Sequence, residues 1–239
     1  MAARDVTTRT VIRFGGVCLA GGALAFLGVF AYLAARFDYP DVLDGPAATV
    51  LPSLLATGHQ GRLVWAIYAL LPLVWLPAGV AAYEALAPVQ RGVMRLALQF
   101  AVVAALAMML GLMRWPSIHW HLALAFERAA PPEQAVLASA FDGLNSYLGN
   151  YIGEFLGELS FSAFFLLTSI VWLQSRRPSR WIGWLGLVTA ASGFLGMFRN
   201  IIGPLAPIAA LNNYLLPLFM VILGVALARW RTSDTPAGI

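Results

Sequence analysis

Two glutamates at a spacing of four residues are the side chains best suited to chemistry in this sequence. Glu154 and Glu158 share one face if their segment is helical. Ionised acids are costly in hydrocarbon and usually face protein, water or an ion. The pair is therefore a candidate for ion ligation or proton transfer. Gly153 and Gly157, directly before the acids, form a strip of small residues that would let a neighbouring helix approach closely.

The same glutamates have a structural alternative, because arginines end two other apolar segments. Arg114 and Arg199 are expected on the same side of the membrane as Glu154 and Glu158. A buried layer of ion pairs would satisfy all four charges and avoid the cost of an unpaired charge in lipid. This structural network is the simpler hypothesis, and it is compatible with a ligand site in the same place.

Four further polar residues could join this cluster. Asp38 and Asp41 follow the first apolar segment, and either could fold back onto one of the two arginines, although charged exit loops are usually solvated. Asn200 and Asn213 could hydrogen-bond a ligand, although asparagine near glycine and proline is also ordinary turn chemistry.

His119 and His121 could hold a metal ion or a haem if their segment is extended, because alternate residues of a strand face one side. Metal sites need three or four ligands. Additional ligands could come only from His59, Glu127, Glu154 or Glu158, which lie at no diagnostic spacing. No metal or cofactor is therefore predicted, and an intramembrane metal or haem enzyme is kept as the second alternative.

Apolar helices must position all these residues. The chain is 60% hydrophobic and 11% charged, with a mean hydropathy of +0.78, which is far more apolar than a soluble domain. A membrane-spanning helix needs about 20 mostly apolar residues. Six segments qualify: 11–35, 63–86, 93–115, 151–173, 181–199 and 214–230. Because each is apolar on every side, we predict an all-α polytopic bundle of six transmembrane helices, forming one domain over residues 1–239.

The long connection between the third and fourth spans has structure of its own. Within Pro116–Asn150, the segments Ala123–Arg128 and Gln134–Asn150 carry apolar residues at helical spacing and are separated by two prolines. We expect two short helices there, lying along the outer interface of the membrane.

Arginine indicates the orientation, because cytoplasmic flanks collect basic residues. All 15 basic residues are arginine, which excludes a lysine Schiff base. One side of the predicted threading holds Arg4, Arg9, Arg13, Arg91, Arg95, Arg176, Arg177, Arg180, Arg229 and Arg231. The other side holds only Arg36, Arg62, Arg114, Arg128 and Arg199. We therefore predict a bacterial inner membrane protein with both termini in the cytoplasm. The scattered arginines form no extended face for nucleic acid.

Short motifs near the span ends suggest a family. They are Phe37-Asp38-Tyr39-Pro40-Asp41-Val42-Leu43, Arg114-Trp115-Pro116, Tyr147-Leu148-Gly149, Gly153-Glu154 with Gly157-Glu158, and Gly196-Met197-Phe198-Arg199-Asn200. With these motifs the chain resembles, over nearly its whole length, the bacterial integral membrane family known as domain of unknown function 4386. The resemblance implies a multi-helix bacterial membrane protein and brings no activity or cofactor with it.

The leading functional hypothesis is a non-enzymatic membrane protein whose outer polar cluster binds a small amphiphile or a lipid. The first alternative is an accessory subunit of a larger membrane complex, with the small-residue strip contacting a protein partner. A transporter is less favoured, because no inverted repeat is visible. The sequence contains no nucleophile elbow, phosphate-binding loop or zinc-protease motif.

Overall fold

The computed structural model of the 239-residue chain describes residues 2–175 and 179–230, so Arg176, Arg177 and Arg231 of the orientation argument lie outside the described residues. Its α-helices are α1 (Ala2–Phe37), α2 (Ala47–Ala56), α3 (Gly58–Leu70), α4 (Trp75–Met113), α5 (Trp120–Arg128), α6 (Pro131–Leu144), α7 (Gly157–Gln174), α8 (Arg180–Gly196) and α9 (Ala206–Ala228). Three 3-10 segments, η1 (Asp41–Asp44), η2 (Leu71–Val74) and η5 (Gly203–Leu205), and two π-helical segments, η3 (Trp115–His119) and η4 (Asn145–Leu156), complete the described elements. These residues contain no β-strand, so the predicted all-α class is confirmed.

Within residues 2–175 and 179–230, four helical stretches are long and apolar enough to cross a membrane: Val6–Phe37, Gly58–Arg128, Pro131–Gln174 and Gly203–Ala228. They cover the predicted spans 11–35, 63–86, 93–115 and 151–173, and most of 214–230. The remaining predicted span, 181–199, falls on α8, which is 17 residues long. The chain thus has the apolar helices of a membrane protein.

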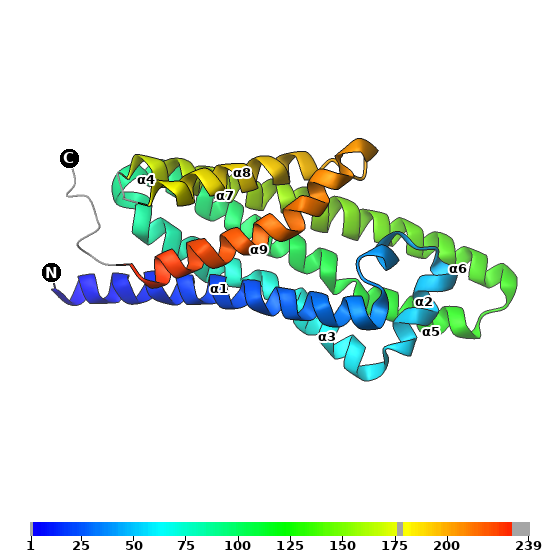
Figure 1. Cartoon of the computed structure of the whole chain (residues 1–239). Coiled ribbons are helices and arrows are strands. Elements are labelled where there is room, and N and C mark those ends of the chain that lie inside the picture. Colours follow the sequence, from blue (N-terminus) through cyan, green and yellow to red (C-terminus); the bar gives the residue numbers. More distant parts are fainter. Residues whose placement is uncertain (1, 176–178, 231–239) are drawn as a thin grey trace. The chain divides into compact units, whose positions relative to one another are not determined.

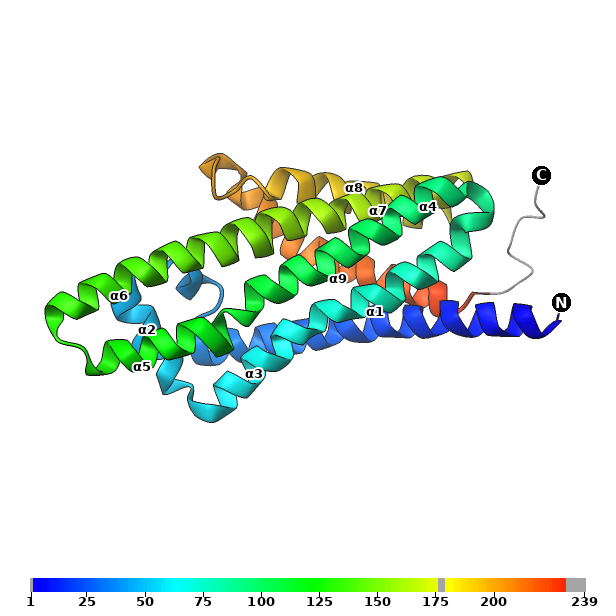
Figure 2. The same ribbon diagram turned by 180° about the vertical axis from the view of Figure 1, so that it is seen from behind.

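The stretch Gly58–Arg128 reverses direction within α4. Gln90 leaves the helical conformation, with φ −148° and ψ 77°, two residues after Pro88, which lacks a backbone N–H donor. Figure 2 shows the ribbon turning back at this end of α4. The two limbs contact each other, since a Cβ added to Gly79 would lie 2.9 Å from the Cβ of Ala101. The turn falls between the predicted spans 63–86 and 93–115.

Helices form where the two short connecting helices were predicted, but the second is not separate. α5 covers Ala123–Arg128, whereas α6 continues through η4 into α7 as one helical run from Pro131 to Gln174, visible in Figure 2. No proline follows Pro132 in this run, and its apolar residues continue at helical spacing. Nothing in the sequence therefore ends the helix at Asn150.

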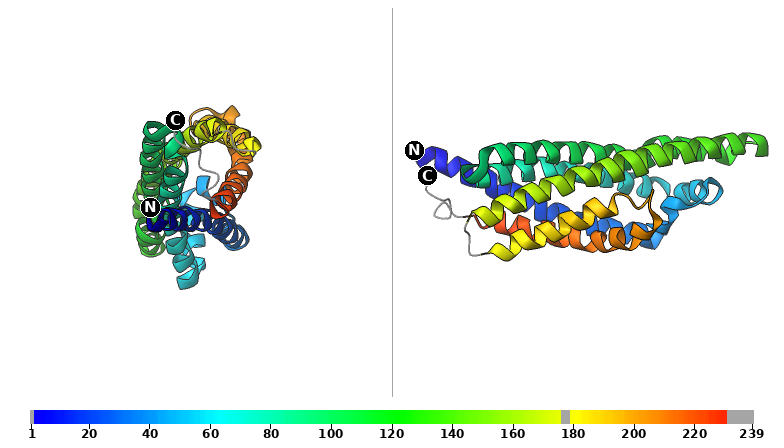
Figure 3. Two further views of the ribbon diagram at one scale, coloured as in Figure 1. Left: turned by 90° about the vertical axis from the view of Figure 1, so that its left-hand side faces the viewer. Right: turned by 90° about the horizontal axis from the view of Figure 1, so that it is seen from above.

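The chain forms two compact units. The first unit comprises Met1–Leu24, Pro72–Leu106 and Phe155–Ile239, and the second comprises Ala25–Leu71 and Ala107–Glu154. One domain for the whole chain stays a prediction. In the first unit, α7, α8 and α9 lie side by side (Figure 3).

Glycines let backbones of the first unit approach one another. A Cβ added to Gly16 in α1 would lie 2.4 Å from the backbone nitrogen of Ala228 and 2.6 Å from the carbonyl oxygen of Gly224. Between α7 and α8, a Cβ at Gly193 would lie 2.2 Å from Ser162 Oγ. Small residues at such crossings are typical of membrane helices, whose association depends on close packing.

The second unit has an aromatic core. The rings of Trp65 and Trp115 stack with centroids 4.9 Å apart, and Phe37 contacts both edge-on. Tyr68 and Phe141 are also fully buried in this cluster. α2, α5 and α6 pack together next to it (Figure 1). Aromatic side chains of α1, α3 and η3 thus hold these segments together.

Candidate functional site

The four charged residues of the predicted cluster belong to different units. Glu158 and Arg199 lie in the first unit, and Arg114 and Glu154 lie in the second. The contacts of the pair in each unit are therefore described separately.

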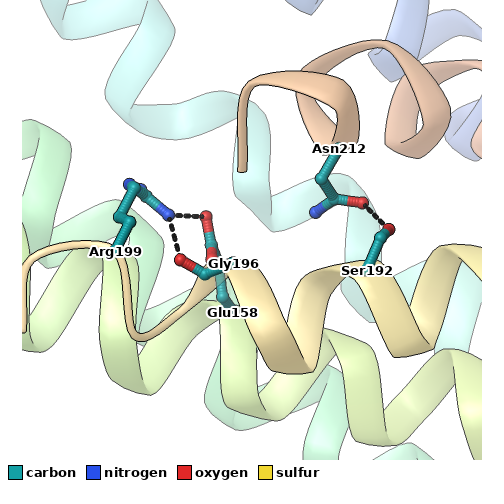
Figure 4. Close-up of polar contacts among 5 residues, drawn as sticks. All are labelled: Glu158, Ser192, Gly196, Arg199 and Asn212. Carbon is teal, nitrogen blue, oxygen red and sulfur yellow. Dashed lines mark hydrogen bonds and ion pairs between the residues drawn. The ribbon is translucent and has the colours of Figure 1, made fainter. Parts of the chain in front are cut away.

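Glu158 and Arg199 form an ion pair in the first unit. Arg199 Nη1 donates hydrogen bonds to Glu158 Oε1 at 2.7 Å and to the carbonyl oxygen of Gly196 at 3.1 Å (Figure 4). Glu158 lies in the first turn of α7, and Arg199 follows the end of α8. Both side chains are mostly buried, with exposed fractions of 13% and 21%. The contact ties these two helices together at one end.

A second polar contact lies beside this ion pair. Ser192 Oγ of α8 donates to Asn212 Oδ1 of α9 at 2.8 Å, and both residues are buried (Figure 4). Asn200 and Asn213, the asparagines predicted as site residues, are exposed. Of the two neighbouring asparagines, Asn212 makes the buried contact, and a ligand-binding role for Asn200 and Asn213 stays a prediction.

Arg114 is a buried arginine of the second unit, with only 5% of its surface exposed. Its Nε donates to Asn145 Oδ1 at 3.0 Å, and its Nη1 donates to the carbonyl oxygen of Gly111. The guanidinium carbon lies 5.1 Å from the ring centre of Trp115. A Cβ at Gly149 would lie 2.5 Å from Arg114 Nη2, so glycine leaves the space that the guanidinium occupies.

Asn145 extends this arginine contact to another segment. Its Nδ2 donates to the carbonyl oxygen of Leu43 in η1 at 2.9 Å, while its Oδ1 accepts from Arg114. Asn145 begins the π-helical η4, and π-helical turns often occur at functional positions. Asn145 was not predicted as a site residue, although it lies within the predicted short helix Gln134–Asn150. Its place in an otherwise helical pattern was the available signal.

Glu154 lies in η4, half-buried and within electrostatic range of Arg114. The close approach predicted for Gly153 is confirmed, because a Cβ at Gly111 would lie 2.5 Å from the Cα of Gly153. Since α4 of the same chain already covers Gly153, this part of the small-residue strip is not available to a partner protein.

The two acids of the first exit loop lie at the surface. Asp38 and Asp41 are both exposed, and Asp38 takes a positive φ of 53° where α1 ends. Their positions fit the solvated-loop alternative and bring neither side chain into the buried surroundings of Arg114.

His119 and His121 have opposite environments. The segment is helical, so residues two apart point in different directions. His119 is fully buried between the rings of Trp115 and Phe141, with centroids 4.8 and 4.7 Å away, whereas His121 is exposed. Over residues 2–175 and 179–230, no three His, Cys, Asp or Glu side chains are grouped to hold a metal ion. The geometry gives the metal or haem alternative no support.

An open groove of about 430 Å³ lies in the second unit. It is lined by His59, Arg62, Leu63, Ala66, Met113, Pro116 and Ser117. Arg62 Nε donates to the carbonyl oxygen of Pro116 at 2.9 Å, and the guanidinium carbon lies 5.1 Å from the ring centre of Trp120. The groove thus combines one held cation with an apolar wall.

The sequence analysis did not identify this groove. It used Arg62 only for orientation and His59 only as a possible additional metal ligand. The available signal was the spacing of three residues between His59 and Arg62 at the start of an apolar helix. The partner segment, Met113–Ser117, lies about fifty residues away in the sequence, so no local pattern could indicate that it completes the groove.

The sequence model of a family described as "Domain of unknown function (DUF4386)" matches residues 14–230. The match includes the groove, Arg114, Glu154, Glu158 and Arg199. The resemblance inferred from short motifs is therefore confirmed over nearly the whole chain. No curated protein and no solved structure matches the chain.

Proposed function

The chain belongs to the family described as "Domain of unknown function (DUF4386)", and we propose that it is a non-enzymatic membrane protein that binds an amphiphile. It crosses a bacterial inner membrane six times, with both termini in the cytoplasm. The groove between α3 and the segment Met113–Ser117 opens at the outer side and is the binding site.

The reversal within α4 supports six crossings. The stretch Gly58–Arg128 is 71 residues long, whereas one crossing needs about 20 residues, and the turn at Gln90 divides it into two. α8 adds the fifth crossing, because its 17 residues at about 1.5 Å each approach the thickness of the hydrocarbon layer. The arginine-rich flanks support the orientation.

The observation that carries the proposed activity is the division of the groove into a polar end and an apolar side. His59 and Arg62 lie near the start of α3, and Leu63 and Ala66 follow toward its centre. Leu63 is 61% exposed, and the exposed apolar face of α3 continues through Ile67 and Leu70. An amphiphile with its headgroup at Arg62 would lay its chain along this face, and the volume suits a small ligand.

The buried charges favour the groove over the cluster first predicted. Arg114 already donates to two protein oxygens and lies against a ring, and Arg199 is paired with Glu158. Such contacts stabilise a buried charge. The charges of the predicted cluster therefore support a structural role, and the groove offers the more accessible surface.

Filling the groove tests this proposal. Ala66→Trp places a ring in the groove, and we expect native mass spectrometry of the detergent-purified variant to lose an amphiphile that the unchanged protein retains. Val136→Trp is the control, because Val136 is an exposed apolar residue of α6 in the same unit and does not line the groove. Equal retention of the amphiphile by both variants would refute binding in the groove.

A further inference from the structure

We propose that the groove binds the phosphate group of an anionic phospholipid, with Arg62 as the principal ligand. This inference rests on the proposed function and specifies its headgroup. Three features carry it: the way in which Arg62 is held, the imidazole of His59 beside it, and the absence of acids from the groove lining.

Arg62 is held so that four of its five N–H donors stay available. Only Nε is used in a hydrogen bond within the chain, to Pro116, and the described residues provide no acceptor for Nη1 or Nη2. The Trp120 ring lies against the guanidinium and fixes its plane. A guanidinium whose geometry is already set can present two N–H groups to one anion at little entropic cost.

His59 supplies a second hydrogen-bonding group on the same face of α3. It lies three residues before Arg62, a spacing that places both side chains next to each other. Both residues lie in the N-terminal half of this 13-residue helix, where the helix dipole also favours an anion.

The residues that line the groove favour a headgroup with a negative charge. It contains no Asp or Glu, so an anion meets no repulsion from the groove itself. Ser117 Oγ donates to the carbonyl oxygen of Met113 and is not a free donor. Two donors from Arg62 and one from His59 match a tetrahedral phosphate with several acceptor oxygens, whereas a planar carboxylate would be satisfied by the arginine alone.

The test compares two lipids that differ in headgroup charge. The detergent-purified full chain is titrated with dioleoylphosphatidylglycerol and with dioleoylphosphatidylcholine, and bound lipid is followed by native mass spectrometry. We expect tighter binding of phosphatidylglycerol. Arg62→Gln should weaken that binding by about tenfold, which corresponds to the loss of one charge-assisted contact, and Arg62→Lys should restore it only in part.

Arg128→Gln is the matched control, since Arg128 is an exposed arginine of the same unit and does not line the groove. It should leave both affinities unchanged. Thermal unfolding of each variant establishes that the protein is folded. His59→Gln, which changes the groove without removing the contact between Arg62 and Trp120, should weaken phosphatidylglycerol binding by a smaller factor.

Several results would overturn the phosphate assignment. Equal affinity for the two lipids, or an affinity for phosphatidylglycerol that Arg62→Gln leaves unchanged, would do so. Oleate binding with the same dependence on Arg62 and an equal affinity would assign a carboxylate amphiphile instead. Competition by millimolar inorganic phosphate would assign a free anion in place of a lipid. In each case the Ala66→Trp experiment separately decides whether an amphiphile occupies the groove.

Discussion

Asn145 shows how a neutral residue can hold a buried charge in place. It accepts a hydrogen bond from Arg114 and donates one to the carbonyl oxygen of Leu43, so both ends of its amide are used. Water cannot replace these contacts readily, because Arg114 and Asn145 are buried. The position of the guanidinium therefore depends on this side chain together with the Gly111 carbonyl and the Trp115 ring.

Replacing Asn145 by leucine should destabilise the protein. Asn145→Leu leaves Arg114 Nε and the Leu43 carbonyl without their partner, and we expect the free energy of unfolding to fall by about 1–3 kcal/mol. Denaturant titration in detergent measures the change. Asn213→Leu makes the same substitution at an exposed asparagine and should have little effect. Equal stabilities of the two variants would show that Asn145 does not hold the arginine.

The sequence indicated that charged residues in the membrane need partners, but it did not always indicate which residues those partners are. The pairing of a glutamate with an arginine followed from the price of a lone charge in lipid, and Glu158 and Arg199 do pair. The role of Asn145 could not be predicted, because its partners, Arg114 and Leu43, are 31 and 102 residues away. The metal hypothesis for His119 required an extended segment, whereas this segment is helical and buries the ring among aromatic residues.

At the scale of elements, glycines set how closely helices meet. Gly16 of α1 and Gly224 of α9 face each other, and their nearest neighbours are backbone atoms. Backbone atoms cannot move away by a change of rotamer, as a side chain can. An added methyl group at this crossing therefore has to push the helices apart.

The substitution Gly16→Ala should destabilise the first unit. Its Cβ would lie 2.4 Å from the backbone nitrogen of Ala228, and overpacking of this kind costs about 1–3 kcal/mol. Gly28→Ala is a matched control in the same helix, because a Cβ at Gly28 meets nothing within 4 Å. It should be neutral or slightly stabilising, since alanine favours helix. Thermal unfolding in detergent compares the two, and equal melting temperatures would contradict a close crossing.

The apolar helices could be predicted because hydrocarbon imposes a length and a composition on every span. Their irregular parts could not. The π-helical η4 and the 3-10 segment η2 differ from an α-helix by a shift of one residue in the hydrogen-bond register, and the hydropathy pattern is too coarse to distinguish them. The run from Pro131 to Gln174 was predicted in two pieces for the same reason.

For the whole molecule, the threading through the membrane decides where the groove opens. Arg62 begins a predicted outward-to-inward span, and the reversal at Gln90 returns the chain. If both limbs of α4 cross, then the groove between α3 and Met113–Ser117 lies at the outer side, where Trp120 can stay at the headgroup level. The proposed orientation toward outer-leaflet lipids thus requires both six crossings and cytoplasmic termini.

Cysteine mapping tests this threading directly, since Cys18 is the only cysteine and Cys18→Ser gives a cysteine-free background. Single cysteines are introduced at the exposed positions Gly92, Ala130 and Gly203, and intact spheroplasts are treated with a membrane-impermeant maleimide. Six crossings with cytoplasmic termini predict labelling at Ala130 and Gly203 and protection at Gly92. Labelling of Gly92 would mean that the turn in α4 lies outside. Protection of Gly203 alongside labelling of Ala130 would mean that α8 does not cross.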